Sequence, residues 1–105
     1  MMQYTLTPEA FQDLGDSLVY LSERSAQAAE KLAVNMRHGF ELLAEFPDAG
    51  RARPEFTQAQ VLFWPIGTYF IVYWLKDNQI EVLAILHASR DLPGLLTDRF
   101  SEDSL

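Results

Sequence analysis

Two consecutive apolar segments in the second half of the chain limit most strongly what it can fold into. Residues 69–75 and 80–87 are rich in β-branched and aromatic side chains, which fit a pleated strand, and a polar turn at residues 76–79 separates them. Both alternating sets of side chains are apolar in the first segment, and Glu81 is the only charge in the second. A half-exposed strand alternates apolar and polar residues, so we expect two interior strands of a sheet.

The first half of the chain supplies two amphipathic helices that can cover such a sheet. Thr7 followed by Pro8 is a typical helix start, because the hydroxyl caps free N–H groups and proline costs nothing at the first position. An apolar stripe at spacings of three and four follows, made of Phe11, Leu14, Leu18 and Leu21. Ser25 is a candidate cap for a second helix, which ends at Phe46 because Pro47 follows. We expect these helices to form an antiparallel hairpin.

Shorter segments complete the predicted fold. Residues 3–6 alternate as a short edge strand does, and residues 60–64 form a further strand. The proline and glycine within residues 65–67 indicate a bulge or corner there, and a short helix or coil begins at residue 92. We therefore predict an α+β fold with the order β-α-α-β-β-β, in which a helix hairpin packs on an antiparallel sheet. At this length we expect a single domain over residues 1–105.

Composition excludes several classes of function. The net charge of -7 argues against broad affinity for nucleic acid or for an anionic membrane, since both require clustered lysine and arginine. The chain has no cysteine, which suits a reducing cytoplasm, and its start does not read as a signal peptide. Its longest apolar run is far shorter than the roughly 20 residues of a spanning helix. We expect a cytoplasmic protein with no membrane partner and no direct nucleic-acid partner.

Local motifs do not identify an active site. The two histidines, His38 and His87, are far apart in sequence, and neither belongs to a cluster with the spacing of metal ligands. A structural role is slightly favoured for His87, although strand ends often carry function. We therefore name no catalytic residue, no metal site and no cofactor. The features that remain are typical of interaction surfaces: Trp64 beside the proline break, and the paired cations Arg51 and Arg53.

Taken together, these segments resemble the ParE branch of the RelE/ParE toxin superfamily of bacterial toxin–antitoxin systems. The likeness covers residues 3–96, in the family's order. Residues 50–56, Gly-Arg-Ala-Arg-Pro-Glu-Phe, are similar to the family's Gly-Arg-x-Arg-x-Glu-Leu, and residues 63–73 resemble its Phe-Pro-Val and Tyr-x-Ile-x-Tyr strands. The most specific piece is His87-Ala-Ser-Arg-Asp-Leu92, which resembles its His-Gly-Ala-Arg-Asp-Leu.

The resemblance implies a compact toxin that binds and poisons DNA gyrase and that a cognate antitoxin neutralises, in a dimer or a heterotetramer. Two alternatives remain open. A RelE-type relative would cut messenger RNA on the ribosome, here with His87 and Arg90, although residues 66–73 carry none of the cations that such chemistry needs. A degenerate toxin would retain antitoxin binding alone. The residues that we expect to meet gyrase or the antitoxin are Arg51, Arg53, Trp64, His87, Arg90 and Asp91.

Overall fold

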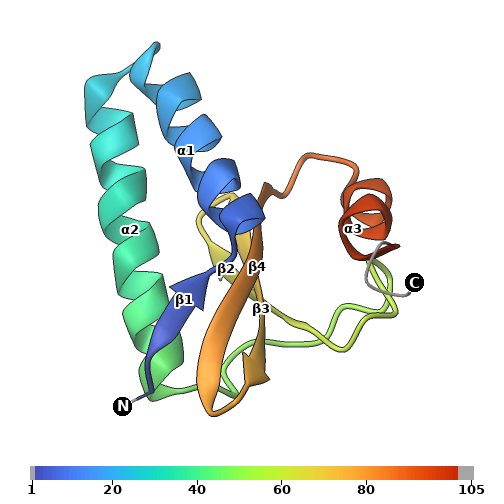
Figure 1. Cartoon of the computed structure of the whole chain (residues 1–105). Helices are drawn as coiled ribbons and strands as arrows, with labels where there is room; N and C mark the ends of the chain where they lie inside the picture. Colours follow the sequence, from blue (N-terminus) through green and yellow to red (C-terminus); the bar gives the residue numbers. More distant parts are fainter. Residues whose placement is uncertain (1, 102–105) are drawn as a thin grey trace.

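The computed structural model describes residues 2–101 and places them in three layers (Figure 1). The elements are β1 (Tyr4–Leu6), α1 (Pro8–Ser22), α2 (Ala26–Glu45), β2 (Leu62–Ile66), β3 (Tyr69–Lys76), β4 (Gln79–His87) and α3 (Leu92–Ser101). A helix pair packed on a mostly antiparallel four-stranded sheet confirms the predicted α+β class. The predicted domain of residues 1–105 includes residue 1 and residues 102–105, which lie outside the described residues.

The two segments predicted as interior strands form the centre of the sheet. The strand order is β1-β4-β3-β2, so β3 and β4 each have a neighbour on both sides. Side chains on both faces of β3 are fully buried, as Ile71, Val72 and Tyr73 show. The sheet departs from the antiparallel prediction at one edge, where β1 pairs with β4 in parallel. This is the arrangement that a strand can reach when a helical connection, rather than a tight turn, separates it from its neighbour.

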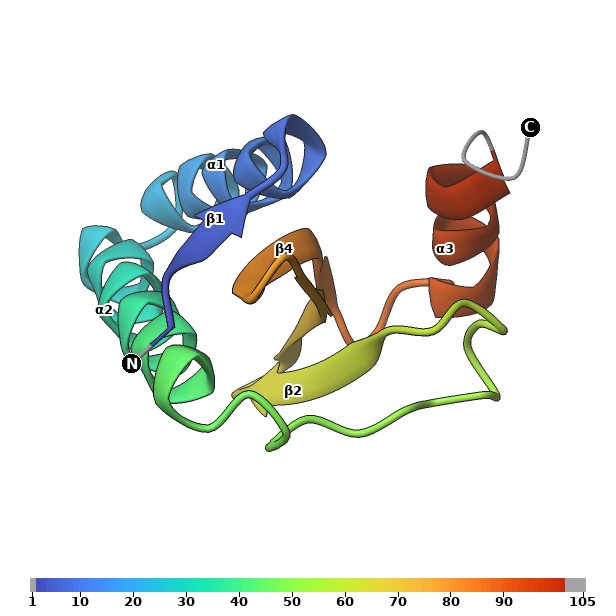
Figure 2. The same cartoon turned by 60° about the horizontal axis from the view of Figure 1, so that its bottom comes forward.

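One face of the sheet is covered by α1 and α2, which run side by side (Figures 1 and 2). Both predicted caps are present, with Thr7 Oγ1 accepting from Ala10 N at 3.1 Å and Ser25 Oγ accepting from Ala28 N at 3.1 Å. The predicted stripe on α1 was wrong at one position, since Phe11 is 70% exposed and Ala10 is buried in its place. The inward-facing positions 10, 14, 18 and 21 are also spaced by three and four residues, as a helix requires. The smallest of these side chains, Ala10, lies in the core.

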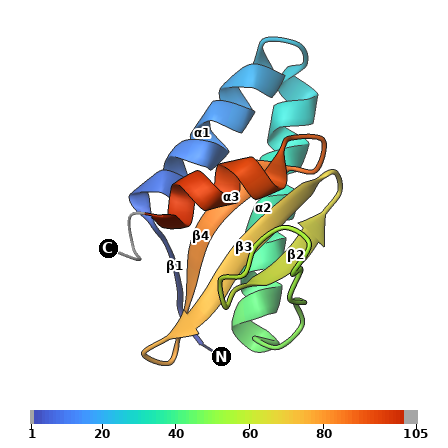
Figure 3. The ribbon, with the colours of Figure 1, turned by 90° about the vertical axis from the view of Figure 1, so that its right-hand side faces the viewer.

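The opposite face of the sheet is covered by α3 and by the irregular segment between α2 and β2. Figure 3 shows α3 crossing in front of β3 and β4. The buried cluster on this side joins side chains of the sheet to two from α3, and its members are Val61, Phe63, Val72, Ala84, Leu86, Leu92 and Leu96. The segment predicted as a terminal helix or coil is therefore a helix that closes the second face.

A buried tyrosine fixes the start of the irregular segment. The hydroxyl of Tyr73 donates to the carbonyl of Pro47 at 2.9 Å and accepts from the backbone N–H of Gly50 at 2.9 Å. Burial raises the pKa of Tyr73 above its ordinary value, because the charged phenolate would lose its solvation there. The tie holds the turn after α2 against the middle of the sheet.

The connections within the sheet follow their local chemistry. Asp77 and Asn78 join β3 to β4 with φ of 54° and 60°, as both central residues of a type I′ hairpin turn require. Of the bulge or corner predicted at residues 65–67, the bulge is absent, because β2 is an edge strand and pairs with β3 through Pro65 and Ile66. The chain turns directly afterwards, at Gly67, whose φ is 56°. The register shifts between Val72 and Tyr73 instead, which leaves Leu83 as the extra residue on β4.

No helix within residues 2–101 is both long enough and apolar enough to cross a lipid bilayer.

Candidate functional site

A cleft of about 600 Å³ that contains predicted site residues lies between α1 and α3, beside the end of β4. We call it the α1–α3 cleft. It contains the half-buried His87 and the exposed Arg90, two of the residues expected from the sequence. Its lining residues come from both helices, from β3 and β4, and from the loop that follows β4: Asp13, Asp16, Ser17, Tyr20, Tyr69, Ile85, Leu86, His87, Ser89, Arg90, Leu95 and Arg99.

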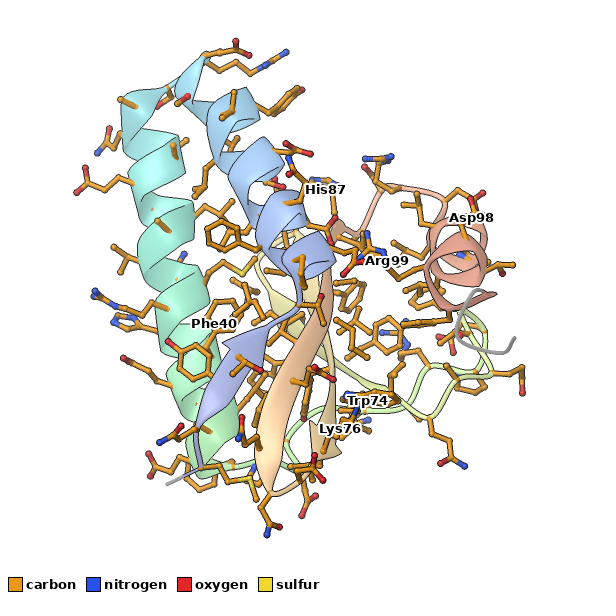
Figure 4. All side chains as sticks on the ribbon, viewed as in Figure 1. Phe40, Trp74, Lys76, His87, Asp98 and Arg99 are labelled. Carbon is orange, nitrogen blue, oxygen red and sulfur yellow. The ribbon has the colours of Figure 1, made fainter. Side chains whose placement is uncertain are left out.

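An ion pair across the α1–α3 cleft ties its two helices together. Two nitrogens of the Arg99 guanidinium lie 3.0 and 3.1 Å from the two carboxylate oxygens of Asp13, the bidentate geometry in which such pairs are strongest. The two side chains are only 24% and 16% exposed. Figure 4 shows Arg99 extending from α3 toward α1. This contact fixes the width of the cleft at its inner end.

The same ion pair also bonds the backbone of β4. Asp13 Oδ2 accepts from the N–H of Ile85 at 2.9 Å, and Arg99 donates to the carbonyl of Leu83 at 2.8 Å. Neither side chain was expected as a site residue from the sequence. The two residues are 86 positions apart. The one available signal was the position of Asp13 directly beside the inward-facing Leu14, and that signal does not name a partner.

His87 is held by its neighbours at the floor of the cleft. Its ring meets Tyr69 edge to face, with centroids 5.0 Å apart. Its Nδ1 lies 3.1 Å from the backbone N–H of Ser89 and 2.7 Å from the Ser89 hydroxyl. Because the backbone N–H donates to Nδ1, the neutral ring carries its proton on Nε2. The imidazole is thus oriented by a local turn, with Nδ1 engaged and Nε2 without a hydrogen bond from any residue between 2 and 101.

The two residues after this turn differ in role. Arg90 is exposed at the rim of the cleft, and its side chain makes no ion pair with any residue between 2 and 101. Asp91 is a helix cap, since its carboxylate accepts from the N–H of Gly94 at 3.2 Å and its carbonyl from that of Leu95 at 3.0 Å. The structure thus gives Asp91 a clear part in starting α3.

The arginine pair predicted as a binding feature lies elsewhere, on the segment before β2. Arg51 exchanges two backbone hydrogen bonds with Phe63, at 3.0 and 2.8 Å, and its side chain is exposed. Arg53 pairs with Glu55 at 2.7 Å, and its guanidinium lies 4.6 Å from the ring centre of Phe56. The hydrogen bond from Arg53 lowers the pKa of Glu55. Arg53 is therefore engaged by an acid and a ring, whereas the Arg51 side chain extends into solvent.

Trp64 belongs neither to the α1–α3 cleft nor to the segment of Arg51 and Arg53. It is half-buried, pairs with Ile71 across the sheet and packs against the core under the helix hairpin. The six residues expected to act together thus occupy three places: the cleft with His87 and Arg90 next to the Asp91 cap, the segment of Arg51 and Arg53, and the helix-covered face. Within residues 2–101, no three His, Asp or Glu side chains are grouped so that they could hold a metal ion.

Comparison with known proteins gives a consistent assignment. Residues 4–92 match the family model described as the ParE toxin of the type II toxin–antitoxin system parDE. The toxin RelE2 of Caulobacter vibrioides is 30% identical over 90 residues, which cover 86% of this chain and 99% of that protein. A solved structure described as the chromosomal ParDE TA system from P. aeruginosa shares the fold with a TM-score of 0.68 and 19% identity, over 85% of this chain and 98% of that one. The chain therefore belongs to the ParE family of toxins of type II toxin–antitoxin systems.

Proposed function

We propose that this toxin acts by binding DNA gyrase and stalling it, and that a cognate antitoxin silences it by occupying its exposed polar surface. The gyrase target rests on the membership of the ParE family. The observation that favours binding over bond-breaking is that the innermost charges of the cleft, Asp13 and Arg99, are engaged with each other and with the backbone of β4. Arg99 is bonded to both carboxylate oxygens of Asp13 and to the carbonyl of Leu83, and Nδ1 of His87 is bonded to Ser89.

The second face of the sheet supports the same proposal. It is filled by apolar side chains from the sheet and α3, and the nearest cation, Arg53, is held by Glu55 and by the rings of Phe56 and Phe70. A nuclease would need free cations and a proton-transfer pair around the scissile phosphate. A surface that holds its charges in pairs is better suited to docking against a protein.

A supercoiling assay with purified gyrase tests the proposal. We expect the toxin to inhibit supercoiling, to trap cut DNA, and to lose both effects when the antitoxin is added. Arg90→Glu should weaken inhibition, whereas Arg37→Glu, an equal charge change on the exposed face of α2, should not. Full gyrase activity at a large excess of toxin would contradict the gyrase target, and harmless over-expression in cells without antitoxin would favour a degenerate toxin.

A second function, ribosome-dependent cleavage of messenger RNA, is favoured by one observation. His87 keeps Nε2 free in a cleft whose rim carries Arg90, the two residues that an acid–base reaction on a phosphate would use. The same preparations should therefore be added to a translating extract. Cleavage that disappears in His87→Ala would replace the gyrase proposal with this one.

We propose that Arg51, Arg53 and Arg90 meet acidic residues of the antitoxin, with Trp64 and Asp91 in the surrounding surface. Because Arg53 already has an acidic partner, we expect its neutralisation to slow association least, and that of Arg90 most. The loss should be larger at low salt than at high salt, as measured by stopped-flow association. Rates that are unchanged at every salt concentration would remove these three residues from the interface.

A further inference from the structure

The end of β4 has an open side along the α1–α3 cleft. β1 pairs only with Ile80, Glu81 and Val82. The N–H of Thr7 then bonds the carbonyl of Val82 at 3.0 Å, and the chain turns away into α1. β4 continues to His87. Beyond Val82, no strand lies beside β4 on this side, so this part of β4 has the backbone of an edge strand.

Side chains, rather than a strand, cover the first part of this edge. The extra residue Leu83 turns its carbonyl to the open side, where Arg99 donates to it. The N–H of Ile85 points the same way and is bonded by Asp13. The Arg99 guanidinium thus donates where the N–H of a neighbouring strand would, and the Asp13 carboxylate accepts where its C=O would. Charged side chains of this kind are a common means of blocking indiscriminate pairing at an edge.

The next two backbone groups are not covered in this way. Ala88 N bonds Thr68 O, so in this antiparallel ladder the residues that exchange hydrogen bonds with β3 are 86 and 88, and those at 85 and 87 point away from β3. The carbonyl of Ile85 and the N–H of His87 therefore point to the side of the cleft, where His87 is half-buried and Ile85 is only 2% exposed, so a bound chain would have to reach the floor of the cleft. Within residues 2–101 neither group has a hydrogen-bond partner.

One residue of a neighbouring extended chain can bond both groups. Its N–H would donate to the C=O of residue 85, and its C=O would accept from the N–H of residue 87. The cleft above them offers apolar contacts from Tyr20 and Leu95, and a charge of each sign from Asp16 and Arg90 on its opposite walls. Its volume of about 600 Å³ suits a short peptide segment. The backbone in the interior of a helix could not use these groups, since its hydrogen bonds are internal.

We propose that the open end of β4, at Ile85 and His87, binds an extended strand of the antitoxin through backbone hydrogen bonds in the α1–α3 cleft. This inference rests on the proposed function, in which an antitoxin neutralises the chain. The Asp13–Arg99 pair sets where the strand stops, because it occupies the preceding rung of the ladder.

Amide hydrogen exchange of the chain bound to the full-length antitoxin tests the inference without any substitution. We expect the His87 N–H to exchange at least about tenfold more slowly in the complex, the factor that a backbone hydrogen bond of ordinary strength supplies. Exposed amides on the outer side of α2 are the internal control. Binding with unchanged exchange at His87 overturns the inference and leaves the proposed function standing, whereas an antitoxin that does not bind overturns both.

A matched pair of variants separates the backbone of residue 87 from its side chain. His87→Ala removes the imidazole and keeps the N–H, while His87→Pro removes both at an edge position whose N–H is not used within the fold. We expect the proline variant to bind the antitoxin about tenfold more weakly than the alanine variant, as measured by calorimetry. Equal affinities in two folded variants contradict the inference. If the proline variant does not fold, the exchange measurement on the unmodified chain decides.

Protection at His87 that appears in the free chain and rises with its concentration would assign the edge to a second copy of the toxin. That outcome would also overturn the proposed occupant.

Discussion

The two faces of the central sheet are covered in different ways. One carries α1 and α2, two long helices that follow each other in sequence, each with a cap and an apolar stripe. The other carries the short helix α3 and an irregular segment, which come from separate parts of the chain. The first cover depends on continuous apolar packing. The second is smaller and is tied to α1 by the ion pair of Asp13 with Arg99.

The difference indicates which side contributes more to stability and which side borders the proposed binding cleft. The helix hairpin and the sheet form the larger buried cluster, in which rings such as those of Tyr4 and Phe40 lie 5.2 Å apart. The cover formed by α3 borders the α1–α3 cleft and the open end of β4. Segments held by fewer apolar contacts open more readily, and binding regions are commonly drawn from them.

The largest expected effect comes from core truncations on the two faces. Phe40→Ala, under the helix hairpin, should lower the free energy of unfolding by about 3–5 kcal/mol. Leu96→Ala, under α3, should cost less, near the lower end of the roughly 2–5 kcal/mol range for such changes, because a short helix can settle into the space. Urea denaturation of both variants measures the difference.

Hydrogen exchange supplies the control for this pair. Leu96→Ala should speed exchange in α3 while leaving α1 and α2 protected, whereas Phe40→Ala should speed exchange throughout. If the two variants lost equal stability and exchanged alike, the two covers would form one cooperative unit and the contrast between them would be wrong.

A smaller effect is expected at the tie between Tyr73 and the turn after α2. Tyr73→Phe leaves the Pro47 carbonyl and the Gly50 N–H without their partner, at a cost of about 1–3 kcal/mol. Burial raises the pKa of Tyr73, so the unfolded chain releases this proton at a lower pH than the folded chain does. The stabilisation is complete below the ordinary tyrosine pKa of about 10 and is lost as pH rises through the raised value.

Unfolding free energies measured between about pH 8 and 11 test this sign. The native chain should lose more stability over that range than Tyr73→Phe does. A variant that loses stability in parallel with the native chain would assign the alkaline sensitivity to other groups.

The smallest effect is expected at Arg53, on the exposed side of the second cover. The hydrogen bond from Arg53 holds the pKa of Glu55 below its ordinary value, so Arg53→Gln should raise it. The contribution of the pair to stability is present above the ordinary glutamate pKa and is lost as pH falls through the lowered one. An NMR titration of the Glu55 carboxyl measures the shift, with Arg51→Gln as the matched control. An unchanged Glu55 pKa in Arg53→Gln would show that the pair does not persist in solution.

The parts of the fold that could be predicted are those with local signals. Apolar runs on both strand faces predicted β3 and β4, and the hydroxyls of Thr7 and Ser25 predicted the helix starts. The parallel pairing of β1 could not be predicted, because three residues carry no information about which neighbour they join. Pro65 was expected to interrupt the strand with a bulge or corner, but the ladder continues through it and the chain turns at Gly67. A proline fits in a strand that lies at an edge, and only the strand order shows that β2 does.

The candidate site was predicted only in part, for a similar reason. His87 and Arg90 stand out because they follow a strong strand and belong to the most family-like run of residues. Asp13 and Arg99 do not, because an acid near the start and a cation near the end each read as ordinary helix surface. The role of Asp13 and Arg99 depends on the tertiary structure, in which their two helices meet at the part of β4 that β1 does not pair with. Trp64 was singled out for its size, and the structure places it in a packing position.

The bond between Asp13 and Arg99 also has a consequence for how the protein is made. Asp13 lies on α1, before most of the sheet, and Arg99 lies on α3, after it, so the pair can form only once the ribosome has released residue 99. Until then, the backbone groups of Leu83 and Ile85 at the edge of β4 lack the bonds that the pair supplies. A partner that binds this strand edge could therefore bind the nascent toxin before Asp13 and Arg99 cover the edge.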